Sequence, residues 1–522
     1  MEKATKFAES IRWPSRIDKD NVALPVISIA AAATLLYSTY RLVSSNNHQR
    51  NGKYTKEIPS PGSCYPYVGH MFSLGQVPSI PVNKWHNELG PLIKLQMGRK
   101  TWIMVNDPFL AHKIFVNNGA ATSYRPHTVY GYHYYGMDGK GVVFAQPGAG
   151  FKKNRAAALS LLAPKQIASF APNIKEESTN LVTRLIEATE KYGSVDPLKN
   201  LELNAMNVIL EATFGKRFKS VDDPEFRKLS EIVELSMKYA GLENDLSNFL
   251  PIISFVDNYT GRQYKWRKFM TTERNPAYEE LIKQAMLKDS PNLMNALEEN
   301  GYPMTMDEKI VFASDMVAAG TDTISVTLSW NFVLMCHHPE VQKRVSAEID
   351  AFVAKHGHLP TFEERSEVPL CISVIKESMR FRPATFFGLP HTLHEEIEVD
   401  GYVIPKDATI LASMHSMHLN PNCYTNPEKF IPDRFMDNLR TMQSCANGRI
   451  EERDHYNFGW GRRVCPGISL AEAEVFASFI QVYSRCFIEP ADGKTMPDIE
   501  TLKNVGLTVL PAAQKLKFTK RF

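Results

Sequence analysis

The chain has 522 residues, of which 43% are hydrophobic and 22% are charged. This composition is typical of a folded protein with a sizeable core, and it excludes a disordered, collagen-like or coiled-coil chain. The formal net charge of +3 gives no electrostatic argument for nucleic acid as a partner. The seven cysteines include no C-x-x-C spacing, so we expect neither a disulfide framework nor a zinc ribbon, and a reducing compartment.

An uncharged stretch near the N-terminus runs from Asn21 to Tyr40 and is bounded by charged residues on both sides. A helix of this length, at about 1.5 Å per residue, would just cross the hydrocarbon layer of a membrane. We therefore predict a single transmembrane anchor at residues 21–41 behind an N-terminal tail at 1–20. A buried core helix is the alternative. A cleaved signal peptide is disfavoured because the apolar run starts late and is long.

Residues 42–60 are interpreted as a linker that leads into a proline-rich segment containing Pro59, Pro61 and Pro66. Proline fixes φ and disfavours helix in the residue before it, so this segment is expected to be stiff and extended. No further linker rich in proline, glycine and serine divides the chain. Residues 61–522 are therefore predicted to form one large domain.

Helical patterns dominate the rest of the chain, and they predict helices at residues 164–191, 201–213, 225–242 and 306–336. A capping box at Thr305 and Glu308 marks the start of the last of these. Short β-like segments occur at 92–105, 397–411 and near 502–510. The predicted fold class is mostly α with minor β.

The strongest chemical signal is the window from Phe458 to Gly467, in which glycines lie on both sides of Cys465. Glycine permits tight turns and a close approach of the backbone, so a thiolate in this loop can reach a flat metal macrocycle. Backbone N–H groups and Arg463 would stabilise the negative charge of the sulfur, and Phe458 would shield it. A buried structural cysteine in a turn is the simpler alternative.

This window resembles the haem-binding signature of the cytochrome P450 family, F-x-x-G-x-R-x-C-x-G. Five residues fill that signature without a mismatch, namely Phe458, Gly461, Arg463, Cys465 and Gly467. The resemblance implies the cytochrome P450 fold, a catalytic domain at 61–522 with haem b as its cofactor, and Cys465 as the ligand of the haem iron.

Two further motifs occur in the order that the family shows. Glu377 and Arg380 share a helix face, and Arg434 follows before the cysteine. The resemblance makes these three residues a buried structural triad that serves folding and haem incorporation. Ala319 begins a match to the motif A-G-x-D-T, which makes Thr323 the alcohol on the oxygen side and Asp322 its acid in a proton relay. Alone, either motif would be read as a solvated helix face.

The haem propionates need cationic or hydrogen-bonding partners. The resemblance assigns this role to Arg463, to His391 and to Arg155, which ends the segment where the family usually shows W-x-x-x-R. Phe151 replaces the tryptophan and cannot donate a hydrogen bond. This departure leaves open whether Lys152 or Asn154 compensates.

The resemblance also implies a distal substrate pocket of largely apolar character, suited to a lipophilic small molecule. Its expected members are Phe144, Ala319, Phe386, Phe387 and Leu507. Some of these aromatic residues could equally be ordinary core, and the pocket does not name a substrate.

The expected activity is that of a haem-thiolate monooxygenase, in which RH, O₂, two electrons and two protons give ROH and water. No flavin or NADPH motif is present, so electrons must come from a separate protein. With the anchor, the resemblance points to the NADPH-cytochrome P450 reductase and to a single-pass protein of the endoplasmic reticulum membrane with a cytosolic catalytic domain. Two alternatives are a haem-thiolate isomerase or dehydratase that rearranges peroxides, and a non-catalytic haem protein that binds a ligand or senses a gas.

Overall fold

The computed structural model describes residues 56–241, 244, 246–250, 261–288, 292–299, 301–513 and 515–522. The predicted tail, the predicted anchor at 21–41 and most of the predicted linker lie outside the described residues. Within the described ranges, no helix combines the length and the apolar character needed to cross a membrane.

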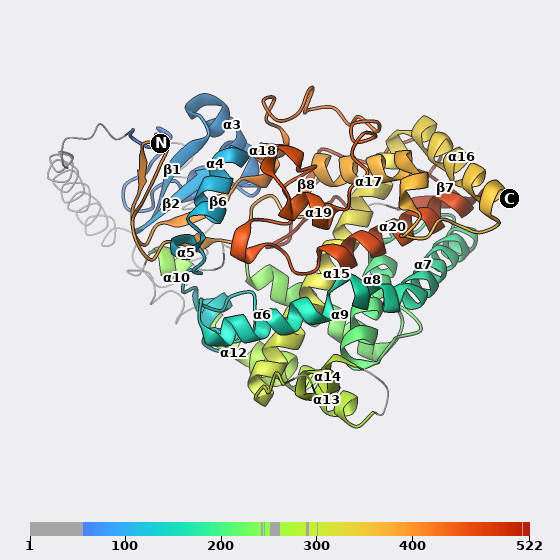
Figure 1. Cartoon of the computed structure of the whole chain (residues 1–522), viewed down its shortest axis with the longest axis horizontal. Coiled ribbons are helices and arrows are strands. Elements are labelled where there is room, and N and C mark those ends of the chain that lie inside the picture. Colours follow the sequence, from blue (N-terminus) through green and yellow to red (C-terminus); the bar gives the residue numbers. More distant parts are fainter. Residues whose placement is uncertain are drawn as a thin grey trace, which may run out of the picture.

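Helices make up most of the described chain, which confirms the predicted fold class (Figure 1). The α-helices are α3 (Ser79–Leu89), α4 (Pro108–His112), α5 (Gly119–Thr122), α6 (Ala149–Leu161), α7 (Pro164–Tyr192), α8 (Leu198–Phe214), α9 (Pro224–Tyr239), α10 (Leu246–Phe249), α12 (Arg262–Phe269), α13 (Asn275–Met286), α14 (Leu293–Glu299), α15 (Met306–His337), α16 (Pro339–His356), α17 (Pro369–Phe381), α18 (Met414–His418), α19 (Met442–Asn447) and α20 (Ile468–Arg485). Single 3₁₀ turns occur at Met71–Ser73, Arg365–Glu367, Ile450–Glu452 and Gly461–Arg463, and π-helical turns at Lys113–Asn117, Val129–Tyr135 and Met270–Arg274.

The strands form small sheets, the largest of which lies at one end of the molecule beside α3 (Figure 1). The strands are β1 (Leu92–Met97), β2 (Lys100–Val105), β3 (His391–Thr392), β4 (Ile397–Val399), β5 (Tyr402–Ile404), β6 (Thr409–Ala412), β7 (Cys486–Pro490), β8 (Leu502–Asn504), β9 (Val509–Pro511) and β10 (Leu516–Lys520). The largest sheet has the order β1-β2-β6-β3, and β2 and β6 are its parallel pair. The strand pairs β4-β5, β7-β10 and β8-β9 are antiparallel hairpins or ribbons.

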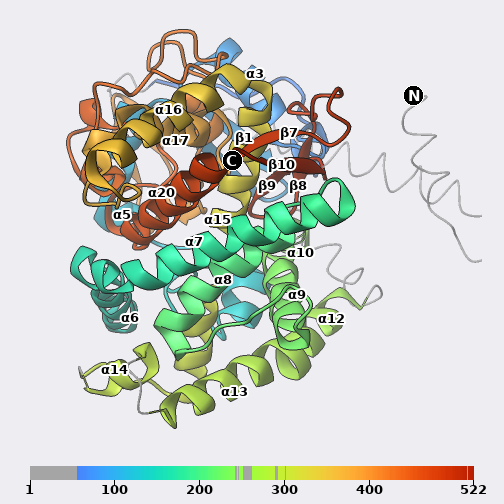
Figure 2. The ribbon, with the colours of Figure 1, turned by 90° about the vertical axis from the view of Figure 1, so that its right-hand side faces the viewer.

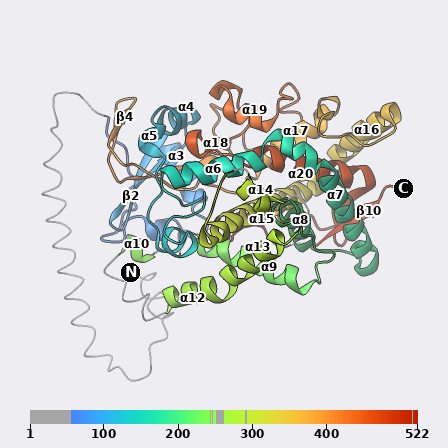
Figure 3. The ribbon, with the colours of Figure 1, turned by 60° about the horizontal axis from the view of Figure 1, so that its bottom comes forward.

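Helix α15 runs through the body and packs against α8, α9, α13, α17 and α20 (Figure 3). The predicted capping box is confirmed: Thr305 Oγ1 accepts from the N–H of Glu308, and Glu308 Oε2 accepts from the N–H of Thr305 at 2.9 Å. Most of its residues are buried all round, as expected of a core helix that bridges two hydrophobic clusters. Ala319 is exposed and Gly320 is partly exposed, and both line an internal cavity.

The other predicted helices correspond to α7, α8 and α9, of which α7 and α8 lie side by side (Figure 2). The predicted end of the third helix at residue 242 is wrong, because α9 ends at Tyr239. There the chain leaves the helix in a turn in which Gly241 N–H donates to Lys238 O at 3.2 Å. Glycine is a poor helix former, so it favours termination at this point.

Candidate active site

A cavity of about 570 Å³ is lined on one side by α15 and on another by the loop that carries Cys465. The residues that were expected to form a substrate pocket all line this cavity, namely Phe144, Ala319, Phe386, Phe387 and Leu507. They come from four separate parts of the chain: the loop before α6, α15, the segment after α17 and the β8–β9 hairpin. The wall around them is mostly apolar and includes Val142, Met316 and Leu411.

The cysteine loop places its thiol on the cavity wall. Cys465 N–H donates to Phe458 O at 2.9 Å, and Gly467 N–H donates to Cys465 Sγ at 3.4 Å. Burial raises the pKa of the Cys465 thiol, while the Gly467 N–H and the charge of Arg155 lower it. The protein alone therefore only partly offsets the cost of a buried thiolate, and a bound metal cation would supply the rest.

Arg463 does not serve the sulfur as expected. Its guanidinium donates to the carbonyl oxygens of Ser123 at 2.9 Å and Val142 at 3.2 Å, and it also bonds Ala145 O. It lies over the ring of Phe151, 3.8 Å from the ring centroid. Phe151 thus acts as a platform for Arg463, and the charge that acts on the thiol is that of Arg155.

Neither residue considered as a substitute for the missing tryptophan lines the cavity. Asn154 is buried and donates to Gly141 O at 3.0 Å, whereas Lys152 is exposed. Arg155 does line the cavity, and its Nη2 donates to Val464 O at 2.7 Å, which ties it to the cysteine loop.

Strand β3 carries His391 to the cavity, where its Nδ1 lies 2.6 Å from Thr122 O. Because the partner is a carbonyl oxygen, Nδ1 must carry the proton. Burial, with the charges of Arg125 and Arg463, holds the pKa of His391 well below its ordinary value. A neutral His391 therefore presents a lone pair on Nε2, and it can donate to a carboxylate only after protonation, which a bound carboxylate would favour.

Arg125 is a cavity residue that the sequence analysis missed. It is 6% exposed, and its Nη1 donates to Leu389 O at 3.0 Å and to Pro390 O at 2.8 Å, next to His391. Together with Arg155 and Arg463 it places guanidinium groups on the same cavity as the thiol. Cationic donors beside a thiol match a ligand that carries carboxylates and a thiophilic metal, so the residues present fit haem.

The acid and the alcohol of the predicted proton relay are not hydrogen-bonded to each other. Thr323 Oγ1 donates to Ala319 O at 2.7 Å along α15, and Thr323 lines the cavity. The Asp322 carboxylate instead accepts from Thr508 Oγ1 at 2.7 Å. Burial raises the pKa of Asp322 to about 6, although the Thr508 hydrogen bond lowers it.

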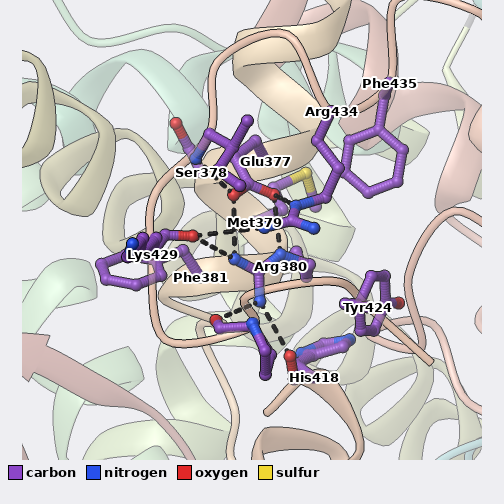
Figure 4. A network of polar contacts seen from close by, with 12 residues as sticks. Glu377, Ser378, Met379, Arg380, Phe381, His418, Tyr424, Lys429, Arg434 and Phe435 are labelled. Atoms are coloured by element: carbon purple, nitrogen blue, oxygen red, sulfur yellow. Dashed lines mark hydrogen bonds and ion pairs between the residues drawn. The ribbon is translucent and has the colours of Figure 1, made fainter. Parts of the chain in front are cut away.

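The predicted triad is assembled in the interior (Figure 4). Arg380 donates from Nε and Nη2 to the two carboxylate oxygens of Glu377, at 2.7 and 2.8 Å. Arg434 Nε donates to Glu377 Oε2 at 3.0 Å. The remaining donors of Arg380 reach backbone oxygens such as that of His418, so the buried charges are paired and hydrogen-bonded. Glu377 and Arg380 are both 0% exposed and lie outside the cavity lining.

Two buried carboxyl groups on the cavity wall were also missed. Asp315 on α15 accepts from the N–H groups of Val142 at 2.7 Å and Val143 at 3.1 Å, and burial raises its pKa to about 6. Glu474 on α20 is 1% exposed, and burial raises its pKa well above its ordinary value. Both are acidic residues flanked mostly by apolar residues in predominantly buried helices, which is the sequence signal that could have identified them.

Comparisons with known proteins match nearly the whole chain. The family model "Cytochrome P450" matches residues 59–518. The chain is 28% identical to cytochrome P450 2D3 of Rattus norvegicus, over 86% of this chain and 90% of that protein. It is 26% identical to germacrene A hydroxylase of Tanacetum parthenium, over 94% and 98%. The solved structure of a zebrafish cytochrome P450 with abiraterone shares its fold, with a TM-score of 0.68 at 23% identity over 85% of this chain and 100% of that one.

Proposed function

Because the chain belongs to the cytochrome P450 family, whose members are haem-thiolate monooxygenases, we propose how its residues divide the work of inserting one oxygen atom into a substrate. The family uses haem b, O₂ and electrons from NADPH that a reductase delivers. The observation that carries the proposal is the convergence of a thiol, cationic side chains and apolar residues on one cavity.

Cys465 is the proposed iron ligand, and Arg125, Arg155, Arg463 and His391 are the proposed partners of the propionates. When bound, haem supplies the activation of dioxygen, which no amino-acid side chain can perform. The protein orients the haem and supplies the positive charges that its carboxylates need. Gly467 N–H donates to the sulfur, and the guanidinium groups, which are already fixed by backbone carbonyls, offer their remaining N–H groups to carboxylates.

Thr323 and Asp322 are the proposed proton-handling pair. A carboxyl group whose pKa is about 6 can take up and release a proton near neutral pH, which is what a relay requires. The Thr323 hydroxyl lines the cavity, and because it donates to Ala319 O, its oxygen lone pairs remain able to accept a hydrogen bond from a neighbour. The Glu377, Arg380 and Arg434 triad is assigned a structural role, since its members lie away from the cavity.

The substrate is a lipophilic molecule that enters an apolar pocket beside Phe144 and Leu507. We further propose that residues 21–41 anchor the chain in the endoplasmic reticulum membrane and that the NADPH-cytochrome P450 reductase is the electron donor. Exposed Lys343 and Arg462 are candidates for a basic docking face. Arg344 contributes less, because it pairs with Asp433.

The first experiment is the reduced-plus-CO difference spectrum of the purified full-length protein and of Cys465→Ala. The wild type is expected to show the Soret band typical of a thiolate-ligated haem that has bound CO, and the variant is expected to lose it. Cys423→Ala is the matched control, because Cys423 does not line the cavity. A wild-type spectrum without thiolate character in well-folded protein would contradict the proposal.

Proton handling is tested with Thr323→Ala in the presence of purified reductase. We expect more hydrogen peroxide released per NADPH consumed than in the wild type, and unchanged release would count against the assigned role. Thr321→Ala is the control, because Thr321 lies on the same helix but does not line the cavity. NADPH consumption coupled to product would exclude a peroxide isomerase or dehydratase. A ligand-binding or gas-sensing protein would be indifferent to Thr323→Ala.

A further inference from the structure

The tip of the β8–β9 hairpin is a tight turn wedged against α9. Val505 N–H donates to Thr508 O at 3.0 Å, and Gly506 N–H donates to Asn504 Oδ1 at 3.0 Å. Gly506 has a φ of +104°, and a Cβ there would lie 2.2 Å from Met237 O at the end of α9. The turn therefore needs glycine at this position.

Helix α15 holds the other side of the same hairpin at two points. Trp330 Nε1 donates to Val509 O at 2.7 Å, and Thr508 Oγ1 donates to Asp322 Oδ2 at 2.7 Å. Thr508 is 1% exposed, so its hydroxyl depends on this acceptor. Its neighbour Leu507 lines the cavity, so a ligand that presses on Leu507 acts on the residue next to the hydrogen bond.

The groups that face Asp322 come from α8, α9 and the hairpin. Burial is the largest influence on its pKa and raises it. Thr508 lowers it, Glu202 and Glu234 raise it, and Lys199 lowers it. Lys199 Nζ lies 2.8 Å from Glu202 Oε2 and 3.7 Å from Glu234 Oε2, so the charges of these three side chains partly cancel. The Thr508 hydroxyl is thus the direct hydrogen-bond donor to this carboxylate among the described residues.

We propose that Thr508 is a positioning residue for proton delivery, and that its hydroxyl holds the Asp322 carboxyl group turned toward the hairpin and away from Thr323. The inference rests on the proposed function of Asp322. It adds that the carboxyl group is controlled from the hairpin tip, which contacts the substrate space. Displacement of the tip releases the carboxyl group, and it can then turn toward Thr323. The acid is therefore restrained for as long as Thr508 donates to it.

The direct test follows the protonated carboxyl stretch of Asp322 by infrared difference spectroscopy over a pH series. Asp322→Asn, subtracted from the wild type, isolates the band. Thr508→Val and Thr508→Ala each remove the donor with different packing, so both are expected to keep the band to higher pH than the wild type does, because loss of a donor to the carboxylate raises the pKa. Thr508→Ser retains the hydroxyl and is expected to restore the wild-type midpoint. An unchanged midpoint in both Val and Ala variants would overturn the inference.

The catalytic consequence is measured as the pH dependence of NADPH oxidation with purified reductase and no added substrate. Thr508→Val is expected to move the profile in the same direction as the infrared midpoint, and to have no further effect when combined with Asp322→Asn. The inference would be refuted if Thr508→Val shifted the infrared midpoint but left the pH profile of NADPH oxidation unchanged, provided that Asp322→Asn alone does change that profile. A profile that Asp322→Asn leaves unchanged would instead refute the proposed role of Asp322, so the two failures are distinguishable.

Discussion

Gly461 has the most demanding backbone position in the cysteine loop. Its φ is +55°, and a Cβ there would lie 2.3 Å from Phe115 O, a backbone atom that cannot rotate away. Gly467 differs, because a Cβ there would meet Cys465 Sγ at an ordinary 3.9 Å. The two glycines therefore occupy the motif for different physical reasons, and only Gly461 is required by contacts within the protein itself.

Gly461→Ala is predicted to abolish haem retention, because the added methyl group forces apart the loop and the segment that carries Phe115. Gly459→Ala is the matched control, since Gly459 also has a positive φ, +70°, but open space around it. That control variant is expected to lose only about 1–2 kcal/mol of folding free energy, which is the strain of a left-handed backbone at a residue with a Cβ. Haem content and thermal unfolding measure both variants. Equal haem loss in the two variants would show that backbone strain, and not the clash, is decisive.

Glu474 is a buried acid whose ionisation opposes folding. Burial raises its pKa well above its ordinary value, and its Oε2 finds no hydrogen-bond partner among the described residues. The folded protein therefore keeps this proton at a pH where the unfolded chain has lost it. The free energy of unfolding consequently falls as pH rises above the unfolded pKa of about 4.3.

Glu474→Gln should remove this pH dependence, because the amide is neutral at every pH. We expect the difference in Tm between variant and wild type to be small at about pH 5 and to grow in favour of the variant toward about pH 8. Glu451→Gln, at an exposed position, controls for general effects of charge. A difference that is constant with pH would mean that Glu474 is ionised in the folded protein.

A buried carboxylate on α15 holds the loop before α6. Asp315 Oδ2 accepts from the N–H groups of Val142 and Val143, and Gly141 approaches so closely that a Cβ would lie 2.5 Å from that oxygen. The same loop supplies Phe144 to the cavity and two carbonyl oxygens to Arg463. A contact on one helix turn thus positions both the substrate wall and a proposed propionate partner.

Asp315→Leu is predicted to loosen this loop, since the buried N–H of Val142 loses its acceptor at about 1–3 kcal/mol and the partly buried N–H of Val143 loses the same acceptor. Asp315→Asn keeps an acceptor oxygen and is expected to preserve most of the contact. Hydrogen exchange of the peptide that contains Val142 and Val143 is the measurement, with faster exchange by about tenfold or more in the leucine variant. Equal protection in all three proteins would contradict this account.

At the scale of the whole molecule, the catalytic domain follows an N-terminal stretch, residues 21–41, that has the composition of a membrane anchor. Stable attachment to a membrane is predicted to depend on residues 21–41, because the uncharged run Asn21–Tyr40 is about as long as the hydrocarbon layer is thick.

Deletion of residues 1–41 is predicted to move the protein from the microsomal pellet to the supernatant while the reduced-plus-CO spectrum is retained. Deletion of residues 1–20 alone is the control and is expected to leave the protein in the pellet. The competing interpretation, a buried core helix at 21–41, predicts the opposite for the larger deletion, namely loss of folded, haem-binding protein.

Features formed within one helix or one turn could be predicted from the sequence alone, because local backbone geometry brings their residues together. The cysteine loop, the capping box of α15 and the Glu377–Arg380 pair belong to this class, as do the long helices with strong periodicity. Pocket residues such as Leu507 were assigned through the family resemblance, and all of them line the cavity.

The orientation of the polar side chains required the packed fold. Asp322 faces Thr508, 186 positions later, and Arg463 faces carbonyl oxygens more than 300 positions earlier. Arg125 joins the site through residues beyond position 380. Each of these side chains had several chemically suitable partners in the sequence, and the spacing of residues along the chain does not indicate which partner it contacts. The choice was made by which buried donors and acceptors lay within reach once the helices had packed, because an unpaired buried polar group costs more than any local preference for a different orientation.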